Sequence, residues 1–110
     1  MDINTRSRGL VDNLCDFNFH ILGCGAIGSA TALQLARMGA MDFCLYDNDK
    51  VETPNIGVSQ YDVDDIGKQK VIALGDKLNQ INDNCNIMAQ NELFNNYIYM
   101  NNDDIIILGF

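Results

Sequence analysis

The sequence predicts an α/β domain built on a Rossmann-like, doubly wound parallel sheet. Short apolar runs typical of buried strands alternate with longer segments in which apolar residues recur every three or four positions. A glycine cluster separates the first apolar run from the first long segment. Such alternation builds a parallel sheet whose faces are covered by crossover helices. The 110 residues suffice for one domain and contain no repeat or linker, so we expect a single domain over residues 1–110.

Four runs have the character of strands, and we expect them near residues 18–23, 42–47, 86–89 and 104–108. The first two combine aromatic and aliphatic residues and stop at a glycine or an aspartate, which are common at strand ends. The fourth contains consecutive large aliphatic residues, which is typical of a strand that is buried on both faces.

Helices are expected over residues 2–15, from the glycine cluster to about Met38, from Asp65 onward and, as a short element, over 91–102. Gly39 is suited to end the second of these, because glycine readily takes the left-handed conformation found at helix C-termini. The third follows a polar loop over 48–64, and its apolar residues have helical spacing.

The fourth expected strand is followed only by Gly109 and Phe110. A parallel strand in such a sheet normally continues into another loop and helix. We therefore expect the chain to be the N-terminal fragment of a longer domain, truncated after the fourth strand, and to catalyse little by itself.

The charge balance limits the partners of the chain. Seven Lys and Arg residues stand against fifteen Asp and Glu residues, so the formal net charge is −8. Binding to nucleic acid or to an anionic membrane needs a basic surface, and we expect neither partner. The apolar runs are far shorter than the roughly 20 residues of a membrane span. The four cysteines form no CxxC pair and no secretory signal precedes them, so we expect reduced thiols and a cytoplasmic location.

The glycine cluster carries the first functional signal. Gly23, Gly25 and Gly28 follow a predicted strand and open a predicted helix. In such a turn the first glycine permits the tight bend, the second lets a phosphate approach the main chain, and the third lets helix and strand pack closely. The first helical residues, Ala26 and Ile27, then offer amides to the phosphates. The alternative is a glycine turn that only packs a strand against a helix.

Asp47 is the second signal, because it ends the next predicted strand. A carboxylate there can accept hydrogen bonds from two ribose hydroxyls, and we expect it to be exposed at the carboxyl end of the strand. The glycines and Asp47 together fit NAD, FAD or ATP equally well. The polar loop that follows contains Asn55 and leads to Lys68 and Lys70, and a dehydrogenase does not need such a lysine.

Four motifs stand in order: the glycine cluster from Gly23 to Gly28, Asp47-Asn48-Asp49-Lys50-Val51, Asn55, and Asp65-Ile66-Gly67-Lys68-Gln69-Lys70. Over about residues 19–87 the chain resembles the ThiF family of adenylyltransferases, whose fold is shared with ubiquitin-activating enzymes. The glycines alone are weak evidence, whereas the ordered set is specific. The resemblance implies a domain that binds ATP and Mg²⁺ and that forms a homodimer in the full-length protein.

The resemblance also assigns roles to single residues. The glycine loop would wrap the ATP phosphates, Asp47 would hold the ribose, and Asn55 would contact the phosphate region. Lys70 would act in catalysis by neutralising the α- and β-phosphates, where charge builds up as a carboxylate attacks. Asp49 is either a second ligand of the nucleotide or a turn residue, and Lys68 is expected to be solvated.

Two features depart from the family pattern. Many members carry an arginine three residues after the position of Asn55, where this chain has Val58. The magnesium-binding aspartate of the family would fall just beyond Phe110, so no residue of the chain is expected to bind a metal. Near the start, Arg8 resembles an arginine that can reach the ATP of a dimer partner, but its short spacing from Gly23 favours a solvated helix arginine.

The resemblance implies an enzyme that activates the C-terminal carboxylate of a ubiquitin-like or sulfur-carrier protein as an acyl-adenylate. A related branch activates a small or tRNA-linked carboxylate instead. Two other functions stay open. One is an NAD(P)-binding Rossmann oxidoreductase, and the other is a non-catalytic partner subunit of an activating enzyme, which Val58 favours.

Other polar residues receive structural interpretations. His20 is expected to be a strand histidine with satisfied hydrogen bonds, and Cys24 a small filler beside the glycines. Asp103 and Asp104 are expected to be solvated at the entry to the last strand.

Overall fold

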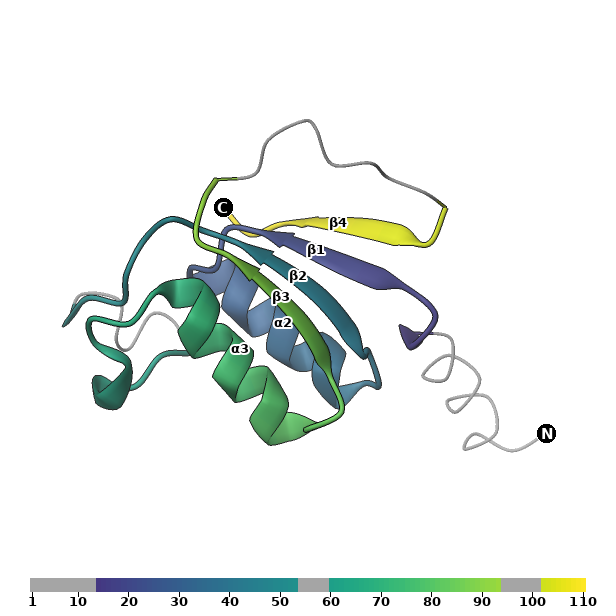
Figure 1. Cartoon of the computed structure of the whole chain (residues 1–110), viewed down its shortest axis with the longest axis horizontal. Coiled ribbons are helices and arrows are strands. Elements are labelled where there is room, and N and C mark those ends of the chain that lie inside the picture. The colour runs from purple at the N-terminus through teal and green to yellow at the C-terminus, as the bar shows by residue number, and fades with distance from the viewer. Residues whose placement is uncertain (1–13, 54–59, 94–101) are drawn as a thin grey trace.

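The computed structural model describes residues 14–53, 60–93 and 102–110. Within these ranges it holds a four-stranded sheet with the spatial order β3-β2-β1-β4, in which neighbouring strands are parallel (Figure 1). The strands are β1 (Asn18–Leu22), β2 (Asp42–Tyr46), β3 (Asn86–Gln90) and β4 (Asp104–Leu108). The predicted strands are confirmed to within one residue at each end. The expected burial of β4 on both faces is wrong, because β4 lies at an edge of the described sheet, and Ile106 and Leu108 are 45% and 60% exposed.

The strand order is that of a doubly wound sheet. From β1 the chain steps outward to β2 and then to β3, and it returns to place β4 on the other side of β1. The direction of winding therefore reverses between β1 and β4. Open α/β sheets bind ligands outside the carboxyl ends of the strands at such a reversal. The predicted Rossmann-like fold is confirmed, and the order singles out one edge of the sheet for a ligand.

Two helices, α2 (Ala26–Arg37) and α3 (Lys70–Ile81), lie side by side on the same face of the sheet (Figure 1). They connect β1 to β2 and β2 to β3. Right-handed crossovers that step in one direction across a sheet bring their helices to the same face. The glycine cluster and Lys70 therefore approach the sheet from the same side.

The core lies between this face and the helices. Phe19 and Ile21 of β1 and Phe43 of β2 are each at most 2% exposed. They alternate along their strands with residues that point to the opposite face, as the period of a strand requires. Leu74 and Leu78, one helical turn apart on α3, are fully buried in the same cluster. The spacing of apolar residues in the sequence thus identifies the core residues of the sheet and those of the helix that packs on it.

The third helix begins later than predicted. Val63–Asp65 forms a separate 3-10 turn, η2, and α3 starts only at Lys70. Between them Gly67 has a φ of +89°, a left-handed conformation that interrupts any α-helix. The expected helix start at Asp65 is therefore wrong, and the polar loop continues to the residue before Lys70.

The expected helices over residues 2–15 and 91–102 lie largely outside the described ranges. In the part of the chain that the structure describes, no helix is long and apolar enough to cross a membrane.

Candidate functional site

A cavity of about 380 Å³ opens at the carboxyl ends of the central strands, where the fold places ligands. It is lined by Leu22, Gly23, Tyr46, Asp47, Asn48, Asp49, Leu93 and Phe110. A smaller cavity of about 240 Å³ lies at the opposite ends of the strands, around Asn18, Asp42 and Asn86. Three of the residues that the sequence singled out, Gly23, Asp47 and Asp49, line the larger cavity, which is the candidate site.

The glycine loop borders this cavity, and its glycines have different surroundings. Gly23 has a φ of +97°, so the tight bend after β1 needs a residue without a side chain. A Cβ on Gly28 would lie 1.8 Å from the carbonyl oxygen of Gly23, so α2 can approach the strand end only with glycine there. A Cβ on Gly25 would meet nothing within 4 Å. These surroundings fit a bend, an open approach and a close packing contact, in the order that the motif predicts.

Gly109 is a further member of this cluster that the sequence analysis missed. A Cβ there would lie 2.1 Å from the carbonyl oxygen of Gly23 and 2.8 Å from the Cα of Gly28. The N–H of Gly109 also donates to the carbonyl of Leu22 at 2.8 Å. The signal available in the sequence was a glycine directly after the last predicted strand. The structure places that strand, β4, beside β1, which leads into the glycine loop.

The start of α2 leaves main-chain donors free for an anion. Ser29 is the first residue whose N–H reaches an acceptor in the helix, the carbonyl of Gly25 at 2.9 Å. Gly25 is the N-cap, and no side chain caps the helix. The amides of Ala26, Ile27 and Gly28 therefore lack acceptors within the helix, and the helix dipole places partial positive charge at them.

Asp47 is buried, at 8% exposure, and the expectation that it would be exposed is wrong. Its Oδ2 accepts the N–H of Cys24 at 2.8 Å, and its Oδ1 accepts the N–H of Asp49 at 2.8 Å. The carboxylate is covered because it turns back onto the loop that it holds. It still lines the cavity, and each of its oxygens has acceptor capacity left for a further donor.

The start of α3 is bonded to the segment that follows Asp47. The N–H of Lys70 donates to the carbonyl of Asp49 at 2.9 Å, and the N–H of Val51 donates to the carbonyl of Lys68 at 2.8 Å. The N–H of Gly67 donates back to the carbonyl of Val51 at 2.9 Å. This antiparallel pairing fixes the position of Lys70 relative to the end of β2.

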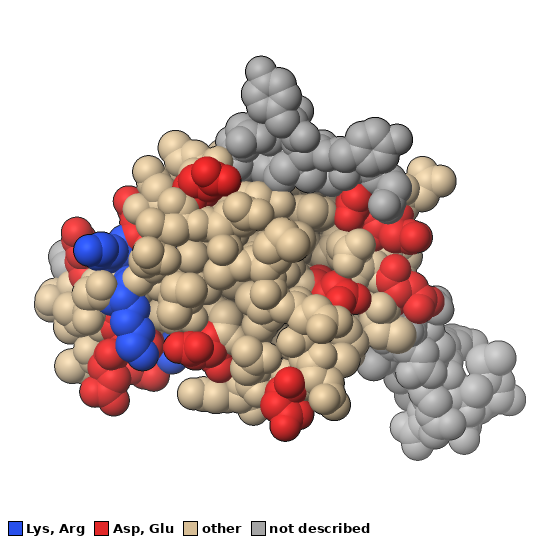
Figure 2. All heavy atoms as spheres, in the orientation of Figure 1, with Lys and Arg blue, Asp and Glu red and all other residues tan. Residues whose placement is uncertain are grey.

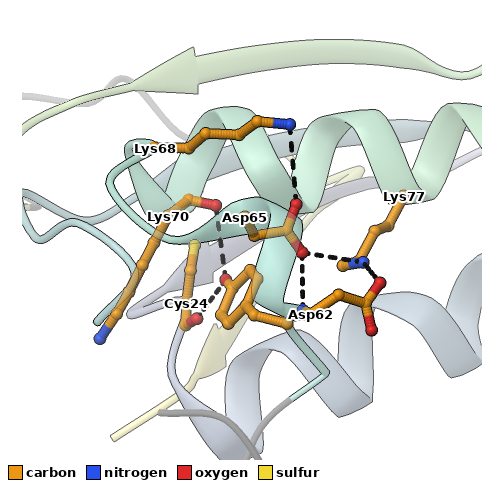
Figure 3. A network of polar contacts seen from close by, with 7 residues as sticks. Cys24, Asp62, Asp65, Lys68, Lys70 and Lys77 are labelled. Atoms are coloured by element: carbon orange, nitrogen blue, oxygen red, sulfur yellow. Dashed lines mark hydrogen bonds and ion pairs between the residues drawn. The ribbon is translucent and has the colours of Figure 1, made fainter. Parts of the chain in front are cut away.

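The two lysines of the motif have different environments. The side chain of Lys70 is 10% exposed, and its Nζ lies 3.8 Å from Oδ2 of Asp49, which lines the cavity. The side chain of Lys68 is 46% exposed and extends toward Asp65, away from Lys70 (Figure 3). On the visible face of the molecule, Lys and Arg gather at the end where the loop before α3 lies (Figure 2). The exposure of Lys68 agrees with its expected solvation.

Tyr61 joins the glycine loop to α3, and the sequence analysis did not single it out. Its ring is in the core, at 3% exposure, and its hydroxyl donates to the carbonyl oxygen of Cys24. The carbonyl oxygen of Lys70 lies 3.4 Å from the same hydroxyl. Burial, with the nearby Cys24, Asp47 and Asp65, raises the pKa of Tyr61, so the hydroxyl stays protonated as a donor. The available signal was one aromatic residue within a polar loop.

An ion-pair cluster of Asp62, Asp65 and Lys77 supports the turn before α3 (Figure 3). The Nζ of Lys77 lies 2.9 Å from Oδ2 of Asp62 and 3.1 Å from Oδ2 of Asp65. The N–H of Asp62 donates to the same oxygen of Asp65 at 2.8 Å. Burial opposes the charge of Asp65, but the bond from Asp62 and the Lys77 ammonium together hold the pKa of Asp65 below its ordinary value.

Cys24 is completely buried within the glycine loop. Desolvation by burial, followed by the charge of Asp47, raises its pKa to about 12. The thiol therefore stays protonated near neutral pH and is a poor nucleophile. This environment agrees with the expected role of a small filler.

His20 is a satisfied strand histidine, as expected. Its Nδ1 lies 3.2 Å from the hydroxyl of Tyr46, and its Nε2 lies 2.9 Å from Oδ1 of Asp104. The expected solvation of Asp104 is wrong, because its side chain is 7% exposed and pairs with this histidine across β1 and β4. Asp103 is exposed.

Asn55, Val58 and Arg8 lie outside the described residues. Within the described ranges, no group of three His, Cys, Asp or Glu residues is arranged to hold a metal ion.

The ThiF family matches residues 3–109 of the chain. Among curated proteins, the chain is similar to ubiquitin-like modifier-activating enzyme 5 of several organisms. It is 40% identical to the Drosophila erecta protein over 75 residues, which cover 68% of this chain and 18% of the relative. It is 36% identical to the Branchiostoma floridae protein over 89 residues, which cover 78% of this chain and 22% of the relative. The chain thus spans about a fifth of the length of these relatives.

The chain is also similar to proteins of known structure. The structure of E. coli MccB with ATP aligns with a TM-score of 0.73 and 30% identity, over 80% of this chain and 26% of MccB. PaaA aligns with a TM-score of 0.73 and 35% identity, over 77% of this chain and 27% of PaaA. MccB has also been solved with MccA.

Proposed function

The chain belongs to the ThiF family, and on that premise we propose that residues 1–110 form the N-terminal part of the nucleotide-binding domain of an ATP-dependent adenylyltransferase. The whole enzyme would activate the C-terminal carboxylate of a ubiquitin-like or sulfur-carrier protein as an acyl-adenylate. The similarity to enzymes that activate ubiquitin-like modifiers supports this substrate class. The similarity to MccB, which has been solved with ATP and with MccA, supports the nucleotide and a protein or peptide acceptor.

The observation that carries the proposal is the bonding of three separate segments at one edge of the sheet. The carboxylate of Asp47 holds the N–H of Cys24, and the carbonyl of Asp49 holds the N–H of Lys70. These bonds bring an acid, the glycine loop and the start of α3 together. A nucleotide along this edge would have a carboxylate at its ribose, amides at its phosphates and an ammonium group nearby.

ATP fits the donors and acceptors that the chain provides. Both oxygens of Asp47 retain acceptor capacity for the ribose hydroxyls. The open space at Gly25 and the amides of Ala26 and Ile27 suit the phosphates. Asp49 faces the same cavity as a second polar contact, and Asn55 is proposed to meet the phosphate region. When bound, ATP would supply the α-phosphate for the acyl-adenylate and pyrophosphate as the leaving group.

Lys70 is the residue that we propose for catalysis. When a carboxylate approaches a phosphate, two anions meet and charge grows on the phosphate oxygens. An ammonium group that is already in place stabilises this charge more in the transition state than in the ground state. The side chain of Lys70 is largely buried, and the main-chain bond to Asp49 fixes its base, so it is suited to this role.

Mg²⁺ is proposed to accompany ATP. The described residues provide no cluster of metal ligands, so we assign no metal ligand and derive no step from the ion. We also propose that the full-length protein is a homodimer in the cytoplasm. Cys24, Cys44 and Cys85 are free thiols, which agrees with a reducing compartment.

Calorimetric titration of the full-length protein with ATP and with NAD tests the nucleotide assignment. We expect tighter binding of ATP, because Lys70 provides a cation that NAD binding does not need. Tighter binding of NAD would favour the oxidoreductase, and a protein that binds neither nucleotide would contradict the proposal.

A non-catalytic partner subunit is the second candidate, because Val58 replaces a phosphate-binding arginine of the family pattern. Pyrophosphate exchange by the full-length protein separates the two. An active enzyme exchanges labelled pyrophosphate into ATP in the presence of the acceptor carboxylate, whereas a partner subunit binds ATP without exchange.

A further inference from the structure

We propose that Tyr61 is a positioning residue that fixes the orientation of the Gly25 amide toward the phosphates of a bound nucleotide. The inference rests on the proposed function of the site. It concerns a residue that lies outside the four sequence motifs and that contacts the glycine loop only through the fold.

The hydrogen bond from Tyr61 acts on the peptide unit between Cys24 and Gly25. In a trans peptide, the carbonyl oxygen and the following N–H point in opposite directions. The Tyr61 hydroxyl holds the carbonyl oxygen of Cys24, so it also fixes the direction of the Gly25 N–H. That N–H is therefore directed opposite to the carbonyl that Tyr61 holds. The space beside Gly25 is open, because a Cβ there would meet nothing within 4 Å.

The preceding peptide unit is fixed independently of Tyr61. Asp47 accepts the N–H of Cys24, and the carbonyl of Gly23 is held between Gly28 and Gly109. Tyr61 therefore controls the peptide unit of the loop that these contacts leave undetermined. Among the described residues, we find no acceptor for the N–H of Gly25.

Tyr61 is itself held firmly. Its ring belongs to the hydrophobic core, and only the hydroxyl reaches the loop. A buried tyrosine combines a fixed apolar body with one polar group in this way. The carbonyl oxygen of Lys70 lies 3.4 Å from the same hydroxyl, so Tyr61 contacts both the glycine loop and the start of α3.

The test compares wild type with Tyr61→Phe, which keeps the ring in the core and removes the hydroxyl. We expect the affinity for ATP to fall about tenfold, while the affinity for adenosine, which has no phosphate, stays unchanged. Nuclear magnetic resonance titration measures both constants in the millimolar range and also follows the Gly25 amide signal. That signal is expected to shift in the variant before any nucleotide is added.

Lys77→Met is the matched control. It removes an ion-pair cluster in the turn before α3 and lowers stability without contacting the glycine loop. We expect it to leave the ratio of ATP to adenosine affinity unchanged.

Equal ATP affinity of wild type and Tyr61→Phe would overturn the inference and leave the proposed function intact. An equal loss for ATP and adenosine would also overturn it, because the hydroxyl would then support only the overall structure. A wild-type chain that does not bind ATP would contradict the proposed function together with the inference.

Discussion

The carboxylate of Asp47 accepts a hydrogen bond of 2.8 Å from the main-chain N–H of Cys24. The acid that ends β2 therefore holds the loop that follows β1, while its other oxygen holds the N–H of Asp49. One side chain both shapes the site and faces the cavity in which we propose the ribose. A substitution there must change stability as well as binding.

Replacing Asp47 with Ala is expected to lower the free energy of unfolding by about 2–4 kcal/mol, because two main-chain amides lose a charged acceptor. ATP affinity is expected to fall at least about tenfold, measured below the melting temperature of the variant. Urea denaturation without nucleotide and calorimetric titration separate the two effects. Asp49→Ala is the control for stability, because it keeps the main-chain bonds and its side chain is 69% exposed. An Asp47→Ala variant as stable as wild type would show that these bonds do not support the fold.

Lys70→Ala is expected to slow adenylate formation in the full-length protein by about 10²–10³-fold, with a smaller loss of ATP affinity. The reason is that charge on the α-phosphate grows during the reaction. Pyrophosphate exchange at saturating ATP measures the rate. Lys68→Ala is the matched control, because its side chain is 46% exposed and extends toward Asp65. Equal losses from both substitutions would refute the assignment of one specific lysine.

Gly28→Ala and Gly25→Ala are expected to fail in different ways. A Cβ on Gly28 would lie 1.8 Å from the carbonyl oxygen of Gly23, and two backbone segments would have to separate. We expect a loss of about 3 kcal/mol or more in the free energy of unfolding, or no folded protein at all. Gly25→Ala is expected to change stability by at most about 1 kcal/mol, since its Cβ would meet nothing within 4 Å.

ATP binding distinguishes the two glycine variants further. The methyl group of Gly25→Ala occupies the approach to the loop amides, so we expect ATP affinity to fall while adenosine affinity is kept. Thermal unfolding by circular dichroism measures stability, and titration measures binding. A destabilised Gly25→Ala variant with normal ATP affinity would reverse the roles of the two positions.

The ion-pair cluster in the turn before α3 predicts a pH dependence of stability. The pKa of Asp65 is held below its ordinary value of 3.8 in the folded chain. Its contribution is therefore present above that value and is lost as the pH falls through the lower folded pKa. Asp65→Asn is expected to flatten the stability profile in this acid range, measured by urea denaturation between about pH 2 and pH 6. Asp64→Asn, an exposed neighbour, serves as the control and should leave the slope unchanged.

The ion pairs of Lys77 predict that the stability of the fold decreases as the pH rises in the alkaline range. Hydrogen bonds to Asp62 and Asp65 outweigh the effect of burial and raise the pKa of Lys77 above 10.5. Its contribution is present below that value and is lost as the pH rises through the higher folded pKa. Lys77→Met should remove this alkaline loss of stability. If the dependence of stability on pH stays unchanged in the variant, the ion pairs of Lys77 do not contribute to the stability of the fold.

The sheet could be predicted from the sequence because its signals are local. The apolar runs are short and bounded, and the consecutive isoleucines of β4 have the composition of a strand. The start of α3 could not be found in this way. The apolar spacing continues past Gly67, and only the left-handed φ of that residue shows that the helix is interrupted there.

The sequence identified several residues of the candidate site but not the contacts between their segments. The motifs identified Asp47 and Lys70, and the structure joins their segments by main-chain bonds. The burial of Asp47 was missed because its partner, Cys24, belongs to another element. Tyr61 and Gly109 were missed for the same reason: each meets the glycine loop only after the chain has folded.

The contact between Gly109 and Gly23 also constrains the order of events during protein synthesis. A nascent chain that has not yet emerged as far as β4 carries the whole glycine motif but lacks the strand that borders it. Contacts between distant parts of a chain form late, because loop closure must come first. Protease protection of ribosome-arrested chains of increasing length should therefore appear at the glycine loop only when residue 109 has left the exit tunnel. The geometry of the glycine loop is therefore expected to form only after β4 has been synthesised.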